Sequence, residues 1–197
     1  MRSGNRSGFT HFLAIVAAAF VVVLSSSQVR ADSTLPVITV TSPTLQAGQP
    51  IPRDHTPDGR NESPALNWSH LPAGTKELAV LCEDYAVGNP PPFVHWIVYS
   101  IPGTATGLPA ALPIDDSPMP PQIAGAVQGL SGFRRAIYRG PAPPRGSLHE
   151  YHFVVYALDT KVSPPPDQPP LTRAQLLDAI DGHVIGKGEL VATYRRE

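Results

Sequence analysis

The sequence is poor in cysteine and in clustered positive charge, and each of these shortages excludes a class of protein. Its single cysteine, Cys82, cannot form an internal disulfide, and the apolar residues 78–81 before it indicate a buried side chain. The 15 Lys and Arg residues are balanced by 16 Asp and Glu and form no cluster, which argues against a nucleic-acid-binding surface. Charged residues are only 16% and hydrophobic residues 42% of the 197 residues, so we expect one folded domain rather than a disordered chain.

Proline, by contrast, is abundant, and all 24 prolines lie after residue 31. Because proline breaks helix interiors, a helical bundle is excluded and a mainly β domain is expected. Apolar segments bounded by Pro, Gly and other turn residues predict the strands. These segments are residues 35–40, 66–68, 77–83, 95–101, 151–158 and 189–194. The strands 77–83 and 95–101 are apolar on successive residues. This pattern predicts that both faces of each strand are covered, as inside a sandwich.

The amino terminus has the pattern of a secretory signal peptide. Arg2 and Arg6 precede a 13-residue apolar run from Phe12 to Leu24, and small residues follow up to Ala31. As a helix, that run would span about 20 Å, which is short of the roughly 30 Å hydrocarbon core of a bilayer. We therefore expect cleavage after Ala31 and a single mature domain of residues 32–197, with 12 basic and 16 acidic residues. The expected location is secreted or periplasmic, without a stable membrane span.

One helix and one long irregular segment complete the expected organisation. Thr172 and Gln175 have the spacing of a capping box, which predicts a helix from Thr172 to Asp181 that ends at Gly182. Ala174, Leu177 and Ile180 would form its apolar stripe. Residues 102–150 are rich in Pro and Gly and far longer than an ordinary connection, and loops of such length are commonly functional or disordered.

Three titratable residues lie at the ends of the apolar strands. Asp84 follows the strand 77–83, His95 begins the next strand, and His149 precedes the strand 151–158 by two residues. If these strands are neighbours, the three side chains meet at one end of the sheet. Two imidazoles that donate hydrogen bonds, with a carboxylate that orients one of them, would suit an anion. Taken singly, each histidine also fits a packing role.

Other chemistries find less support in the sequence. His149 and His152 are three residues apart, so on a strand they point to opposite faces and cannot share one metal ion. With one cysteine, the common structural zinc sites are absent, and we expect neither a metal nor a cofactor. Residues 129–133 (GLSGF) do not match a nucleophile elbow, and no phosphate-binding P-loop occurs.

The chain resembles the phosphatidylethanolamine-binding protein (PEBP) family, also called Raf kinase inhibitor-like proteins, in its bacterial branch. Matching segments occur in order from about residue 40 to the end of the chain. They are residues 63–68 (SPALNW), 72–76 (PAGTK), 93–102 (FVHWIVYSIP), 138–146 (YRGPAPPRG), 149–153 (HEYHF), 182–185 (GHVI) and 189–191 (ELV). The resemblance implies a Greek-key β-sandwich with a few peripheral short helices.

The resemblance also implies a small pocket for phosphate-like or carboxylate anions. Its acid and two histidines would be Asp84, His95 and His149, its rim Gly140 and the Pro143-Pro144 turn, and one wall Tyr151. Two segments depart from the family pattern. Asp84-Tyr85-Ala86 replaces Asp-Pro-Asp, and His149-Glu150-Tyr151 replaces His-Arg-Tyr, so a cation becomes an anion at the pocket's edge. We expect these changes to lower anion affinity or to change the ligand.

Our leading hypothesis is a non-catalytic binding module whose partner is an anionic small molecule or a phospholipid head group. The alternative is a protein-interaction factor that inhibits a protease or kinase through its long loops, with the pocket secondary. A hydrolase with His95 or His149 as the base is a third possibility, but no nucleophile is identifiable in the sequence.

Overall fold

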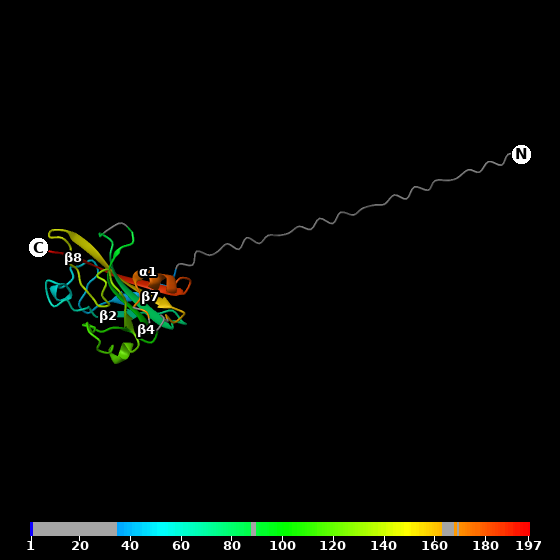
Figure 1. Ribbon diagram of the computed structural model, residues 1–197, viewed down its shortest axis with the longest axis horizontal. Coiled ribbons are helices and arrows are strands. Elements are labelled where there is room, and N and C mark those ends of the chain that lie inside the picture. Colours follow the sequence, from blue (N-terminus) through cyan, green and yellow to red (C-terminus); the bar gives the residue numbers. More distant parts are fainter. Residues whose placement is uncertain (2–34, 88–89, 163–167, 169) are drawn as a thin grey trace. The chain divides into compact units, whose positions relative to one another are not determined.

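The computed structural model describes Met1, residues 35–87, residues 90–162, Gln168 and residues 170–197 (Figure 1). The expected signal peptide, residues 1–31, therefore lies outside the described residues. The elements in chain order are β1 (Thr39–Thr41), η1 (Arg53–His55), β2 (Leu66–Ser69), β3 (Glu77–Asp84), β4 (Phe93–Pro102), β5 (Gly107–Leu108), η2 (Pro121–Ile123), β6 (Val127–Gln128), β7 (Leu148–Leu158), α1 (Arg173–Ala179) and β8 (Val184–Arg195). None of the helices in this part of the chain has the length and hydrophobicity needed to cross a bilayer.

Two antiparallel sheets form the fold, which confirms the expected mainly β class. The larger sheet has the strand order β6-β4-β3-β7-β8, and the smaller has the order β1-β2-β5. Trp68 of the small sheet belongs to the same buried cluster as Val80 and Phe153 of the large sheet. The main hydrophobic core thus contains residues from both sheets.

Strand β3 is buried on both faces, as its continuous apolar sequence predicts. Val80 and Cys82 lie in the core shared by the two sheets, whereas Ala79 and Leu81 belong to a second core that includes Leu176 of α1. Successive side chains of a strand point to opposite faces, so one face packs towards the small sheet and the other towards the helix. This alternation also separates the last two residues of β3, Glu83 and Asp84.

Helix α1 begins as the sequence predicts, and of the predicted apolar residues Ile180 is buried and Leu177 is partly buried against the second core. The backbone N–H of Thr172 donates to Oε1 of Gln175 at 3.0 Å, and the Thr172 side chain accepts from the Gln175 backbone N–H, which completes the capping box. The expected apolar stripe was wrong at Ala174, which is exposed, while Leu176 and Ile180 are buried. A helix of two turns buries one narrow strip, and residues four apart define that strip here.

Features of β7 and β4 direct the residues of the site described below to the same side of the large sheet. On β7, His149, Tyr151 and Phe153 are buried, whereas the residues between them are exposed or half-buried. On β4, the pairing with β3 passes from Val94 directly to Trp96, so His95 sits in a bulge. A bulge inserts an unpaired residue and redirects side chains, which lets His95 and the core residue Trp96 lie on the same side of the sheet.

The predicted strand 35–40 is shorter in the structure, and the segment predicted as irregular contains short elements. The first strand covers only Thr39–Thr41, and Val37 makes an isolated bridge to Lys187 instead. The long irregular segment contains β5, η2 and β6, and the rest of it is turns and extended chain. After β6 it continues towards the end of the large sheet, where residues 133–144 contribute to the site described next.

Candidate functional site

A cavity of about 730 Å³ lies where the end of β3 meets the starts of β4 and β7. Because β3 is antiparallel to both neighbours, these three strand ends share one edge of the sheet. We call this space the Asp84 cavity. Its lining residues are Asp84, Ala86, Val87, Phe93, His95, Phe133, Arg139, Ala142, Pro143, Pro144, His149, Tyr151 and Arg196. Five of the six residues singled out in the sequence, all but Gly140, are among them.

Asp84 and His149 form a buried pair on neighbouring strands. Nδ1 of His149 lies 2.8 Å from Oδ2 of Asp84, and the other carboxylate oxygen, Oδ1, accepts from the backbone N–H of Ala86 at 2.8 Å. The carboxylate only accepts in its ionised form, so Nδ1 of His149 carries the proton and Nε2 is left for another partner. The pair fixes the orientation of the imidazole in the cavity wall.

His95 is also held through Nδ1, but by a backbone group. Nδ1 lies 2.8 Å from the carbonyl oxygen of Arg139, and since a carbonyl only accepts, this nitrogen carries the proton. Burial lowers the pKa of His95 below its ordinary value of 6.5, although the Arg139 carbonyl and Asp84 act in the opposite direction. The neutral ring is therefore favoured near pH 7, and its Nε2 is then an acceptor.

Aromatic rings surround these titratable groups. The ring of His95 makes edge contacts with Phe93, Phe133 and Tyr151 at centroid distances of 5.2 to 5.5 Å. Burial, with the neighbouring Asp84 carboxylate as the next cause, raises the pKa of Tyr151 far above its usual range. Its hydroxyl thus stays protonated and remains a hydrogen-bond donor at the end of a largely apolar wall.

Gly140 is not among the residues that line the cavity, although its backbone lies beside His95. Its backbone N–H donates to Oδ1 of Asn61 at 2.9 Å, and a Cβ at this position would lie 1.9 Å from the carbonyl oxygen of His55. The neighbouring Tyr138 hydroxyl donates to the same carbonyl. Gly140 is therefore required for close backbone packing against η1, while Pro143 and Pro144 line the cavity.

Sequence reasoning missed the two arginines of the cavity. Arg139 lies next to Gly140 in a segment that had been noted, and its guanidinium stacks over the Phe133 ring at 4.5 Å from the centroid. Arg196 comes from the residue after β8 and had no signal in the sequence. Glu150, which replaces the family's arginine, is exposed on the strand and does not line the cavity. The cavity therefore contains two cations despite that replacement.

The opposite face of the same strands carries a separate polar cluster. His152 points away from the Asp84 cavity, as its spacing from His149 predicts, and its Nδ1 lies 2.5 Å from Oε1 of Glu189. Glu83, which is 1% exposed, accepts from Nε of Arg173 at 2.5 Å and from the Tyr85 hydroxyl at 3.1 Å. This buried ion pair attaches the start of α1 to β3.

The side chains of the cavity can be compared with those that common nucleophiles and metal sites require. Its described lining contains no Ser, Thr, Cys or Lys side chain that would act as a nucleophile. Within residues 35–87, 90–162 and 170–197, no three His, Cys, Asp or Glu side chains gather as a metal site would require. The lining of the Asp84 cavity presents hydrogen-bond donors and acceptors and two guanidinium groups, together with aromatic rings.

Comparison with known proteins gives a consistent assignment. A sequence model described as phosphatidylethanolamine-binding protein matches residues 41–195. A UPF0098 protein of Methanothermobacter thermautotrophicus is 38% identical over 146 residues, which cover 74% of this chain and 91% of that protein.

Two solved structures are similar in both sequence and fold. Escherichia coli YbcL, described as a member of the mammalian PEBP family, has a TM-score of 0.73 and 32% identity, covering 81% of this chain and 99% of that one. A PEBP homolog of Chlamydia trachomatis, CT736, has a TM-score of 0.69 and 34% identity, covering 82% and 99%. The resemblance drawn from the sequence is confirmed, and the chain belongs to the phosphatidylethanolamine-binding protein family.

Proposed function

We propose that this chain is a non-catalytic binding protein whose Asp84 cavity takes a small anionic group, either a phosphoryl or a carboxylate group. The observation that carries the proposal is the meeting of Asp84, His95 and His149 at one cavity, beside Arg139 and Arg196. Buried polar groups are costly unless they have partners, and here each imidazole has Nδ1 in a hydrogen bond and Nε2 left for a ligand.

A phospholipid head group is the source of the anion that the family description favours. Its phosphodiester would accept hydrogen bonds from the guanidinium groups and from Tyr151, while the aromatic walls formed by Phe93 and Phe133 would contact its apolar or cationic part. No covalent step is proposed, because the described lining contains no Ser, Thr, Cys or Lys side chain.

The test is calorimetric titration with glycerophosphoethanolamine, a soluble phosphodiester, at pH 5.5 to 8.5. A monoester is unsuitable because it gains charge near pH 6. At pH 5.5, where an imidazolium can donate from both nitrogens, we expect H149A to weaken binding about tenfold or more, since charge-assisted hydrogen bonds contribute about 1.5 to 3 kcal/mol. The matched control is H152A, which removes an imidazole from the opposite face of β7.

Binding that is equal in H149A and H152A would overturn the proposal. Capture of a protease or kinase by the wild type, with no effect of the cavity variants, would favour the alternative of a protein-interaction factor.

We further propose that the chain is exported and that residues 1–31 are removed as a signal peptide, on the basis of the basic start and apolar run. Expression from the native start in a Gram-negative host, followed by fractionation and amino-terminal sequencing, tests this. The expected product begins at Asp32 in the periplasm, and an uncleaved protein in the cytoplasm would contradict export.

A further inference from the structure

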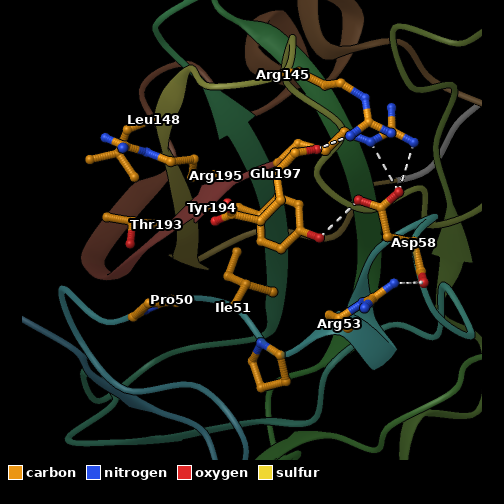
Figure 2. Close-up of a pocket in the computed structure, with 12 residues that line it drawn as sticks. Pro50, Ile51, Arg53, Asp58, Arg145, Leu148, Thr193, Tyr194, Arg195 and Glu197 are labelled. Atoms are coloured by element: carbon orange, nitrogen blue, oxygen red, sulfur yellow. Dashed lines mark hydrogen bonds and ion pairs between the residues drawn. The ribbon is translucent and has the colours of Figure 1, made fainter.

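Arg196 lines the Asp84 cavity, but Asp58, which accepts its hydrogen bonds, lines a different cavity. A second cavity of about 580 Å³ includes Arg53, Asp58, Arg145, Tyr194 and Arg196 in its lining. Figure 2 shows this cavity, with Asp58 on one side, the Tyr194 ring in the centre and Arg195 on the far side from Asp58. Arg196 is common to the linings of both cavities.

The alternation of β8 explains why Arg196 and not Arg195 reaches the Asp84 cavity. Ala192 and Tyr194 are buried on the core side of the strand, whereas Arg195 is exposed. Arg196 follows at the next inward position, directly after the strand ends. The two adjacent arginines thus have different surroundings, and Arg195 lines only the second cavity.

Asp58 holds the Arg196 guanidinium in a defined place. Nε and Nη2 of Arg196 donate to Oδ1 of Asp58 at 3.0 and 2.7 Å, and the Tyr194 hydroxyl donates to Oδ2 at 2.9 Å. Hydrogen bonds from Tyr194 and then Arg196 lower the pKa of Asp58, so its carboxylate is ionised at neutral pH. The backbone carbonyl of Arg196 accepts from Gly146 at 2.8 Å, which also fixes the chain beside the Pro144 rim.

The remaining nitrogen of Arg196 is the one suited to a ligand. Nη1 makes no hydrogen bond within the part of the chain that the structure describes, and the side chain is 37% exposed. A guanidinium is always charged and presents its donors in a fixed plane, which matches the oxygens of a phosphodiester or carboxylate. Holding it by Asp58 reduces the side-chain entropy lost when an anion binds.

The other charged groups of the cavity make this cation necessary at neutral pH. The Asp84 carboxylate is negative and is bound to His149, and His95 favours its neutral form. A neutral imidazole with Nδ1 already donating has no donor left for an anion. Arg139, the other cation, is exposed and stacks on Phe133.

We propose that Arg196 is a ligand-binding residue of the Asp84 cavity, whose guanidinium, held by Asp58, supplies a fixed positive charge to the anionic group of the ligand. Because a guanidinium is always charged, this contact persists at neutral and mildly alkaline pH. This inference rests on the proposed function, because it assigns a further contact within the same binding site.

The experiment compares glycerophosphoethanolamine affinity at pH 8.0 for wild type, R196Q and the matched control R195Q. We expect R196Q to bind about tenfold more weakly or worse and R195Q to stay within about twofold of wild type, because a charge-assisted contact is lost only in the first. R196K should recover part of the affinity, since lysine restores the positive charge but not the paired N–H donors of the guanidinium. Equal losses of affinity in R196Q and R195Q would overturn the proposal. The general positive potential of the two arginines, and not a direct contact of Arg196, would then explain both losses.

A second readout is made on the wild-type protein, and the variant R196K serves only to assign the signal. The Nε–H signal of Arg196 in ¹H–¹⁵N spectra, assigned by its absence in R196K, is expected to shift as the probe is added. A signal that does not move while the probe binds overturns the role of Arg196 and leaves the proposed function in place. Failure of the wild type to bind the probe at any pH, by contrast, would overturn the proposed function and this inference together.

Discussion

Asp84 and His149 are joined by a 2.8 Å hydrogen bond between neighbouring strands, and their side chains are only 2% and 10% exposed. The contact connects the end of β3 with the start of β7 at the edge of the cavity. It therefore contributes both to the packing of the sheet edge and to the orientation of the His149 imidazole.

Removal of the Asp84 side chain should destabilise the domain. D84A leaves the Nδ1 hydrogen of buried His149 without its acceptor, and an unsatisfied buried group costs about 1 to 3 kcal/mol. D84N keeps an acceptor oxygen of the same shape and should cost less. The free energy of unfolding from urea titration checks the order, and a D84N variant less stable than D84A would contradict this account.

The lowered pKa of His95 gives stability a defined pH dependence. Below about pH 6.5, its ordinary value, the unfolded chain binds a proton at His95 more readily than the folded chain does. The free energy of unfolding should therefore fall as pH decreases through this range. The control is H95Q, which cannot titrate, and urea midpoints from pH 7.5 to 5.5 should decrease more for wild type than for H95Q. Parallel decreases would remove His95 as the cause.

The ion pair under α1 should contribute more to stability than an exposed one. R173A leaves Glu83, 1% exposed, without its guanidinium partner, which we expect to cost about 3 kcal/mol. The matched control is R60A, whose pair with Asp54 has side chains 63% and 55% exposed and should contribute far less to stability. Thermal denaturation of both variants at low salt provides the comparison, and equal losses would contradict the burial argument.

Gly140 should be intolerant of any side chain. G140A places a Cβ 1.9 Å from the His55 carbonyl oxygen, a backbone atom that cannot move independently, so we expect a loss of about 3 kcal/mol. G125A is the control, because its Cβ meets nothing within 4 Å and only the positive φ of 91° costs about 1 kcal/mol. Chemical denaturation measures both, and a G140A variant as stable as G125A would show that η1 shifts at little cost.

Much of the fold was predictable because it depends on local patterns. The continuous apolar runs around Val80 and Val98 predicted strands with two covered faces, and the Thr172–Gln175 spacing predicted the start of α1. The strip of α1 that is buried was not predictable, because neighbouring elements, rather than helical periodicity alone, decide which residues face the core.

The site was predictable only in part, for a related reason. Asp84 and His149 lie at strand ends, where sequence position indicates a common sheet edge. Arg196 reaches the cavity because of the register of β8 and because of its hydrogen bonds to Asp58, which lies 138 residues away in the sequence. The tight packing of Gly140 on His55 likewise depends on a contact between distant segments, which no local pattern encodes.

The adjacent acids at the end of β3 show how the core determines the chemistry of the cavity. Asp84 faces the cavity, while Glu83 faces α1 and pairs with Arg173. Because side chains alternate along a strand, a shift of β3 by one residue would exchange the two acids and would also move Val80 and Cys82 into the second core, which is packed around Ala79 and Leu81. Selection for a well-packed interior therefore also preserves the identity of the carboxylate in the cavity, even in descendants that no longer use the same ligand.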